Sequence, residues 1–209
     1  ATAHLIGWAL HRMTGLPWVA DMRDPMTAPD YPTNPMVRRA NLWVEGLTVR
    51  NASRIVFTTP GAAGAYRARY PDVPAARFCL IENGYDEENF AEATAPAQDD
   101  GAGAGAPARP LTLIHSGIIY PHERNPEPFL EAIAALHKQG KLSGDEVRIV
   151  LRATVHDDYL NGLIGKLGIA GIVSVAPHIA YRAALAEMME ADGLLVLQGS
   201  VCNHQIPAK

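Results

Sequence analysis

The sequence predicts an α/β protein built on two parallel sheets. Short apolar runs of strand length alternate with stretches of helical periodicity, and one run rich in alanine, glycine and proline interrupts this alternation at residues 94–110. Continuous apolar strands that alternate with helices are typical of parallel sheets covered on both faces. We therefore expect two layered domains, residues 1–93 and 111–209, on either side of a flexible linker.

Composition and charge exclude several classes of protein. The 209 residues are 48% hydrophobic and 19% charged, as in ordinary globular domains, and the net charge of -4 argues against a broad surface for nucleic acid. No apolar run approaches the roughly 20 residues that span a bilayer. The two cysteines, Cys79 and Cys202, are too few for a disulfide framework and fit a reducing compartment. We expect a cytoplasmic protein.

In the first domain, helical periodicity begins at once, over His4–Met13. A second helix is expected over Asn34–Asn51, where the apolar set is Val37, Leu42, Trp43, Leu47 and Val49. A third helix ends at about Arg69. The strands of this domain, bounded by proline, glycine or Asn-Gly, are expected at residues 18–22, 54–58 and 77–81.

In the second domain the same alternation returns. Asn125 and Pro126 predict the start of a helix, since asparagine caps helices well and proline suits the first turn. The strands are expected at residues 111–115, 147–153, 172–175 and 194–197. The helices are expected at residues 126–138, 157–167 and 181–191.

Three polar clusters follow predicted strands, where ligands of parallel sheets bind. Residues 21–25 place Asp21 and Asp24 beside Arg23, and residues 81–86 contain Asn83-Gly84. The first cluster is equally consistent with an ion-paired turn, and a sequence like the second is more often a plain turn than a site. In residues 116–126, a glycine, a cation and a helix N-terminus together favour a phosphate, although Arg124 could also be a solvated loop residue. Neither domain has the GxGxxG of a dinucleotide fold.

The order and spacing of these clusters resemble the retaining GT-B glycosyltransferases, most closely the large group called family 4. The motifs that carry the resemblance are PWVADMRDP (17–25), SRIVFTT (53–59), IENGYD (81–86) with Phe90, HSGIIYP (115–121), RNP (124–126), YRAALAEMMEAD (181–192) and IPAK (206–209). The resemblance implies two Rossmann-like domains of GT-B type, both incomplete in this chain. It implies a hexosyltransferase that moves a sugar from a nucleotide-sugar to an acceptor with retention.

The resemblance also implies roles for single residues. Gly117 would let the diphosphate approach the backbone, and Arg124 and Lys209 would neutralise its charge. Arg23 stands where many relatives have a histidine. The implied donor-binding set is Gly117, Arg124, Arg152, His178, Gln198 and Lys209. The implied catalytic set is Arg23, Asp24, Arg124 and Lys209, and the implied acceptor-side set is Asp21, Arg23, Asn83 and Gly84.

Protein cations and helix dipoles would stabilise the leaving diphosphate in such an enzyme, so neither a metal nor a further cofactor is expected. The implied partners are a nucleotide-sugar donor and a sugar or lipid-linked acceptor of cell-envelope or polysaccharide synthesis. Such an acceptor is compatible with peripheral contact between the protein and the inner face of the membrane.

The chain begins within a helix and ends at residues 206–209, which read as the entry to another helix. We therefore expect an internal fragment with little or no transferase activity by itself, and with exposed sheet edges through which it could oligomerise. Two other readings stay open. One is a sugar-nucleotide epimerase of the same shape, with Asp21 and Asp24 as acid and base, and the other is a non-catalytic α/β binding domain.

Overall fold

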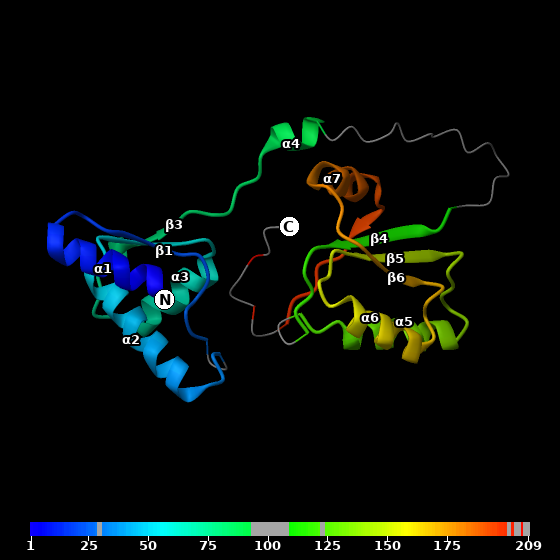
Figure 1. The fold of residues 1–209 in the computed structure, drawn as a ribbon, viewed down its shortest axis with the longest axis horizontal. Helices are drawn as coiled ribbons and strands as arrows, with labels where there is room; N and C mark the ends of the chain where they lie inside the picture. The colour runs from blue at the N-terminus through cyan, green and yellow to red at the C-terminus, as the bar shows by residue number, and fades with distance from the viewer. Residues whose placement is uncertain (29–30, 93–108, 122–123, 200–201, 203–205, 207–209) are drawn as a thin grey trace. The chain divides into compact units, whose positions relative to one another are not determined.

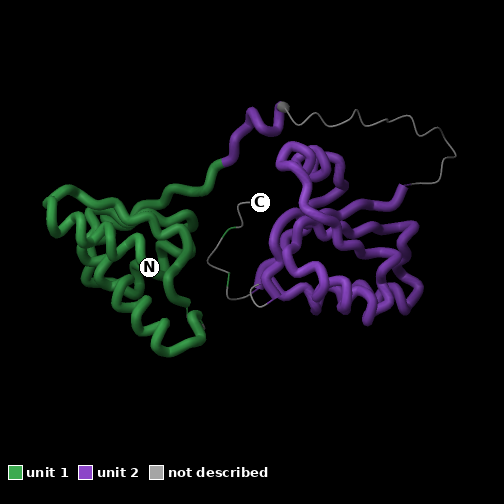
Figure 2. The backbone as a smooth tube through the Cα atoms, in the orientation of Figure 1, with its two compact units in different colours: residues 1–84, 200–208 green, residues 85–199, 209 purple. Residues whose placement is uncertain are grey.

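The computed structural model of the protein describes residues 1–28, 31–92, 109–121, 124–199, 202 and 206. These residues form two compact units, which we call unit 1 (chiefly residues 1–84) and unit 2 (chiefly residues 85–199) (Figure 2). Each unit contains one parallel sheet with helices packed on it, so the predicted α/β fold with two parallel sheets is confirmed. Most of the predicted linker, residues 94–108, lies outside the described residues.

The sheet of unit 1 has three parallel strands in the order β1-β2-β3 (Figure 1). They are β1 (Val19–Met22), β2 (Arg54–Phe57) and β3 (Phe78–Leu80), with Met22, Phe57 and Leu80 in register at their carboxyl ends. The helices are α1 (Thr2–Thr14), α2 (Pro35–Asn51), α3 (Pro60–Arg69) and a 3-10 turn at Ala75–Arg77. All the strands and long helices predicted for this part of the chain are present.

Local chemistry explains where the helices of unit 1 begin and end. The Asn34 side chain accepts hydrogen bonds from the backbone N–H groups of Met36 (3.0 Å) and Val37 (3.2 Å), and so caps α2. The Thr59 hydroxyl caps α3 in the same way. Gly15 ends α1 at φ 70°, a left-handed conformation that glycine adopts at little cost.

The predicted apolar face of α2 is wrong. Trp43 is 60% exposed, and Val37 and Leu42 are also exposed, whereas only Val49 of that set is fully buried. The buried residues of α2 are Val44, Glu45, Gly46, Thr48 and Val49. The face of α2 that packs on the core of unit 1 is therefore partly polar. Glu45 lies on this face because its carboxylate accepts hydrogen bonds from other side chains there.

The sheet of unit 2 has four parallel strands in the order β6-β5-β4-β7. These are β4 (Leu111–Ser116), β5 (Val147–Arg152), β6 (Val173–Ala176) and β7 (Gly193–Leu194). Helices α5 (Glu127–Lys138) and α6 (Asp157–Leu167) cover one face, and α7 (Tyr181–Glu190) covers the other (Figure 1). The chain thus winds outward from β4 to β6 and then returns across β4 to β7.

Unit 2 differs from the sequence-based expectation in three details. Strand β7 is shorter than the predicted run 194–197, although the Leu195 N–H still bonds to the Ile114 carbonyl at 2.8 Å. Helix α5 begins at Glu127, whose N–H donates to the Asn125 side chain at 3.0 Å. A short helix, α4 (Glu87–Glu92), was not predicted, and it packs beside α7 in unit 2.

Each unit has its own hydrophobic core. In unit 1 the inward residues of the strands, among them Ile55 and Phe57, pack on α2 and α3. In unit 2, Leu130 of α5 and Leu160 of α6 pack on Ile149 and Leu151 of β5. Within the described residues, no helix combines the length and the apolar character needed to cross a bilayer.

Candidate active site

The acceptor-side cluster lies at the carboxyl edge of the unit 1 sheet. Asp21 is an outward residue of β1, and Arg23 and Asp24 follow directly after the strand; all three are exposed. The Thr58 hydroxyl, at the end of β2, donates to the Arg23 carbonyl at 3.1 Å and so joins the ends of the two strands. No ion pair links these three residues or involves them elsewhere in the described chain, so the ion-paired turn is not formed.

The turn expected at Asn83-Gly84 is also not formed. Residues 81–86 follow β3 as an irregular segment, and Gly84 keeps a negative φ, unlike Gly15 or Gly117. The N–H of Ile81 still bonds to the Phe57 carbonyl at 2.9 Å, which places this segment at the same edge as Arg23. Because β2 separates β1 from β3, Asn83 follows a strand roughly 10 Å away from β1. The sheet therefore gathers these predicted residues at one edge.

The predicted donor site lies at the point where the strand order of unit 2 reverses. The connection after β4 leads to β5 on one side, whereas β7 returns on the other side of β4. A crevice at the carboxyl ends of such a pair of strands is where ligands of open α/β sheets bind. Gly117 directly follows β4 and Gln198 lies shortly after β7, so both belong to this switch point.

Gly117 has a backbone that few other residues would adopt. Its φ is 128°, and its N–H donates to the Arg152 carbonyl at 2.9 Å, which continues the pairing of β4 with β5 beyond the strands. A positive φ at the end of a strand turns the chain sharply and leaves its backbone approachable. This geometry fits the close approach of a phosphate that the sequence predicted for Gly117.

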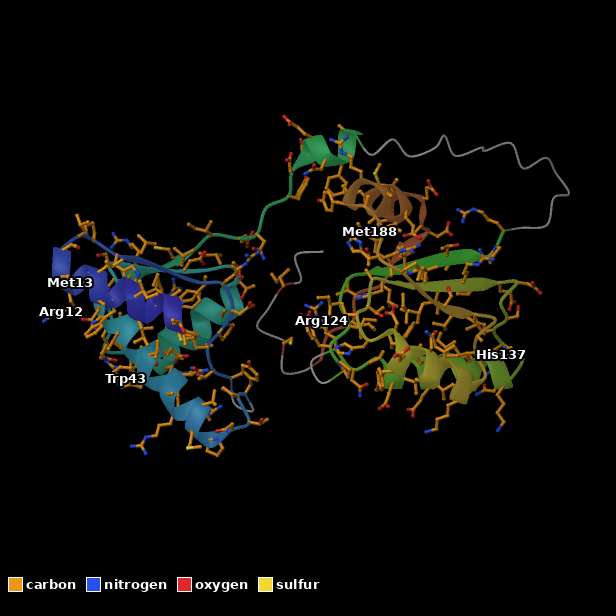
Figure 3. All side chains as sticks on the ribbon, in the orientation of Figure 1. Arg12, Met13, Trp43, Arg124, His137 and Met188 are labelled. Atoms are coloured by element: carbon orange, nitrogen blue, oxygen red, sulfur yellow. The ribbon has the colours of Figure 1, made fainter. Side chains whose placement is uncertain are left out.

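Arg124 lies on the same side of unit 2, where β4 leaves the sheet, whereas His137 lies at the opposite side (Figure 3). Its N–H bonds to the Tyr120 carbonyl at 2.8 Å, and its side chain is half-buried. Within the described residues, no hydrogen bond or ion pair engages its guanidinium. The N-terminus of α5 begins three residues later, at Glu127. A cation and a helix N-terminus both favour an anion at this place.

Arg152, the last residue of β5, is held by other protein groups. Its Nε donates to Glu187 of α7 at 2.8 Å, its Nη2 donates to the second oxygen of the same carboxylate, and its Nη1 donates to the Pro177 carbonyl at 2.8 Å. The hydrogen bond to Glu187 raises the pKa of Arg152 above its usual value. These contacts tie β5 to α7 and to the turn that precedes it. The predicted donor-binding role of Arg152 stays a prediction, and Glu187 was not foreseen as its partner.

The remaining donor-site residues are only partly described. His178 is exposed and comes two residues after β6, next to the Pro177 carbonyl that Arg152 binds. Gln198 is exposed as well. Lys209 and the predicted helix entry at residues 207–209 lie outside the described residues. Among the described side chains, no group of three His, Cys, Asp or Glu residues could hold a metal ion.

The segment after β5 contains two strained residues at this same edge. Ala153 and Val155 have φ angles of 57° and 69°, in the left-handed region that glycine prefers. A left-handed backbone costs an L-residue about 1–2 kcal/mol, and a branched side chain is especially unfavourable there. Backbone strain of this kind clusters at functional sites. It marks the carboxyl edge of unit 2 independently of the sequence motifs.

Relief of this strain should stabilise unit 2. Val155 is 69% exposed, so Val155→Gly loses little packing and should raise the free energy of unfolding by about 1 kcal/mol. The matched control is Val196→Gly, since Val196 is 52% exposed and has no left-handed backbone. This change should lower stability, because glycine only adds freedom to the unfolded chain. Urea unfolding followed by far-UV circular dichroism measures the stability of both variants. A loss of stability in Val155→Gly would contradict the inference that the backbone is strained at Val155.

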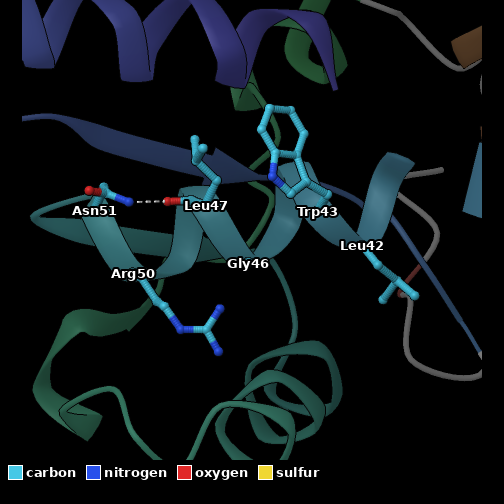
Figure 4. Close-up of a pocket in the computed structure, with 6 residues that line it drawn as sticks. All are labelled: Leu42, Trp43, Gly46, Leu47, Arg50 and Asn51. Carbon is cyan, nitrogen blue, oxygen red and sulfur yellow. Dashed lines mark hydrogen bonds between the residues drawn. The ribbon is translucent and has the colours of Figure 1, made fainter. Parts of the chain in front are cut away.

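A hollow of about 310 Å³ opens beside α2 in unit 1 (Figure 4). Six residues of that helix line it, namely Leu42, Trp43, Gly46, Leu47, Arg50 and Asn51. The Asn51 side chain donates to the Leu47 carbonyl at 2.7 Å and so adds only a local bond. None of the predicted site residues belongs to this hollow.

The sequence-based reasoning missed a buried polar cluster in unit 1. Glu45 of α2 is 0% exposed, and its carboxylate accepts hydrogen bonds from four side chains. The donors are Thr27 (2.9 Å), Tyr66 (2.7 Å), Arg69 (2.7 Å) and Tyr70 (2.8 Å). Burial, and then the adjacent Glu45 carboxylate, raise the pKa values of Tyr66 and Tyr70 far above the usual range. The available signal was a single acid, Glu45, within an otherwise non-acidic helix.

Comparisons with known proteins support the fold and the family resemblance. Residues 1–84 match the family model described as a glycosyl transferase 4-like domain. Among curated proteins, none matches the chain. Three similar solved structures can each be superposed on 92% of this chain.

The first of these structures is sucrose-phosphate synthase from Thermosynechococcus elongatus (17% identity, TM-score 0.66). The others are a glycosyltransferase from Rickettsia africae ESF-5 (10%, 0.51) and the apo form of the lipopolysaccharide outer core galactosyltransferase WaaB (11%, 0.55). The chain covers 47%, 54% and 46% of these structures, so it spans about half of their length. Residues 1–84 therefore match the glycosyl transferase 4-like domain, and the chain has the fold of GT-B glycosyltransferases, which confirms the resemblance of its motifs.

Proposed function

We propose that this chain is part of a glycosyltransferase in which unit 2 binds a nucleotide-sugar donor and unit 1 binds the acceptor. The observation that carries the proposal is that Gly117, Arg124 and the start of α5 all lie in the connection that follows β4, at the switch point of unit 2. The match of residues 1–84 to a glycosyl transferase 4-like domain supports the same reaction class. Donor, acceptor, retention and a role in cell-envelope synthesis at the inner membrane face all belong to this proposal.

The proposed chemistry places most of the work on charge stabilisation. Transfer breaks the bond between the anomeric carbon of the sugar and a diphosphate oxygen, and forms a bond from that carbon to a hydroxyl oxygen of the acceptor, whose proton passes to the leaving group or to solvent. The leaving diphosphate keeps the bonding electron pair and gains negative charge. Arg124, the N-terminus of α5 and the backbone at Gly117 would face that charge. Arg152 would act less directly, since its bonds to Glu187 and Pro177 hold the turn that carries His178.

The removal of the Arg124 guanidinium should weaken donor binding. We expect Arg124→Ala to bind nucleotide-sugars about ten-fold or more weakly, because a hydrogen bond to a charged group contributes about 1.5–3 kcal/mol. The matched control is Arg148→Ala, since Arg148 is an exposed arginine early in β5, away from the carboxyl edge. Isothermal titration of both variants tests the expectation. Equal losses of affinity in the two variants would contradict the assignment of Arg124.

Product analysis separates transfer from the alternative reactions. The full-length protein that contains this chain is incubated with a nucleotide-sugar, with and without a candidate acceptor, and the sugar products are resolved by mass and by anomeric configuration. A glycosylated acceptor with a retained anomeric centre supports the proposal. An epimerised nucleotide-sugar formed without acceptor would contradict it.

A further inference from the structure

A single buried acid connects three elements of unit 1. Glu45 lies in the middle of α2, while Tyr66 and Arg69 belong to α3, and Thr27 lies in the segment that follows β1. All four bonds to the Glu45 carboxylate measure 2.7–2.9 Å. A buried carboxylate is very costly unless it is paired and fully hydrogen-bonded, and this one meets both conditions. The cluster is therefore a fixed anchor.

Side chains of this cluster form hydrogen bonds that hold the segment after β1 in place. The Tyr66 hydroxyl accepts a bond from the Met26 N–H at 3.1 Å, and Arg69 donates to the Thr27 hydroxyl at 2.7 Å. Two side chains of α2 also hold this segment: Arg38 donates to the Tyr31 carbonyl at 2.8 Å, and Asn41 donates to the Met26 carbonyl at 3.4 Å. Met26 and Thr27 are almost fully buried.

The held segment comes directly after the exposed residues of the proposed acceptor side. Arg23 and Asp24 stand between β1 and Met26, and their side chains have no partner of their own among the described residues. One end of this stretch is fixed by the sheet and by Thr58, which binds the Arg23 carbonyl. The other end is fixed through Met26 and Thr27, and through the Ala28 carbonyl, which accepts a hydrogen bond from Arg38. The backbone positions of Met26 and Thr27 therefore constrain the position of Asp24, two residues before Met26.

We propose that Glu45 and Arg69 are positioning residues for the acceptor-side loop, residues 23–28, and act on it through Met26 and Thr27. Neither residue touches the acceptor in this scheme. They set the backbone on which Arg23 and Asp24 are presented at the edge of the sheet. That an acceptor binds at this loop rests on the proposed function. The fixing of the loop by Glu45 and Arg69 does not depend on any reaction.

The loop can be released without leaving an uncompensated charge in the core. Thr27→Val keeps the shape of the side chain but removes the hydroxyl that donates to Glu45 and accepts from Arg69. Thr27→Ser keeps that hydroxyl and should restore the wild-type behaviour. Tyr70→Phe is the matched control, because Tyr70 also donates to Glu45, yet no hydrogen bond joins it to residues 23–28 within the described chain.

Hydrogen exchange read by mass spectrometry decides the matter. In Thr27→Val the amides of residues 24 and 26–28 should exchange about ten-fold faster or more, since the two hydrogen bonds between the Thr27 hydroxyl and the charged side chains of Glu45 and Arg69 are lost. Thr27→Ser and Tyr70→Phe should exchange at close to the wild-type rate there. Wild-type exchange in Thr27→Val, or equal acceleration in Tyr70→Phe, would overturn the proposal.

A second arm measures the consequence for transfer. Thr27→Val should raise the KM for the acceptor about ten-fold and leave the KM for the donor unchanged, with recovery in Thr27→Ser. An unchanged acceptor KM would overturn the positioning role. If the full-length protein that contains this chain glycosylates no acceptor at all, the proposed function fails, whereas the exchange measurement still decides whether the anchor holds the loop.

Discussion

Glu45→Gln should lower the free energy of unfolding of unit 1 by about 3–5 kcal/mol, the usual cost of removing one partner from a buried ion pair. The amide of glutamine would place an N–H₂ group opposite side chains that donate to Glu45, such as Tyr66 or Tyr70. Arg69, whose side chain is only 32% exposed, would also lose its carboxylate partner. The three tryptophans all lie in unit 1, so urea unfolding followed by their fluorescence reports this unit.

The same chemical change at an exposed pair provides the control. Asp72 pairs with Arg50 at 3.0 Å, and both side chains are more than half exposed. Asp72→Asn should therefore cost only about 0–1 kcal/mol, as is usual for surface ion pairs. If Glu45→Gln were as mild as Asp72→Asn, the buried anchor of unit 1 would not exist as described.

Leu130→Ala should destabilise unit 2 by about 2–5 kcal/mol, because it leaves a cavity in a core that does not readily collapse. Leu130 is fully buried in α5, against the cluster that includes Ile149 and Leu160. Far-UV circular dichroism during urea unfolding measures the loss. The tryptophan fluorescence midpoint should not move, since unit 2 contains no tryptophan.

Leu136→Ala is the matched control on the same helix. Leu136 is 39% exposed, so its truncation should cost less than about 1 kcal/mol. A shift of the tryptophan midpoint in Leu130→Ala equal to the shift seen by circular dichroism would mean that the two units unfold together. That result would contradict their description as two compact units with separate cores.

The positions of the strands were largely predictable from the sequence. Continuous apolar runs such as 54–58 and 111–115 became β2 and β4, because parallel strands that are covered by helices need apolar residues along their length. Helix starts marked by asparagine or proline were also close to their observed places. Strand β7 was overestimated, since the apolar run 194–197 continues past the last paired residues.

The inward face of α2 could not be predicted from periodicity. Leu42 and Trp43 look like core residues in the sequence, but the core selected the face that carries Glu45. That choice depends on Tyr66, Arg69 and Tyr70, which come more than twenty residues later. A pattern read along one helix contains no information about such partners.

The candidate site was predictable in location and less so in its contacts. Residues after parallel strands had to gather at one edge of each sheet, as Arg23 and Gly117 do. The pairing of Arg152 with Glu187 was not predictable, because the two lie on different elements, 35 residues apart. The strain at Val155 was equally hidden, since valine gives no sign of a left-handed backbone.

The most direct measurement is the thermal unfolding of the chain in the presence of UDP-, GDP- and ADP-sugars, followed by far-UV circular dichroism. A nucleotide-sugar at a hundred times its dissociation constant should stabilise the unit that binds it by about 2.7 kcal/mol. We predict that at least one of these donors raises the unfolding temperature of unit 2, and that a ten-fold weaker affinity in Arg124→Ala reduces this stabilisation to about 1.4 kcal/mol or less at the same concentration. Unfolding at the same temperature with every sugar-nucleotide would contradict a donor site at Gly117 and Arg124.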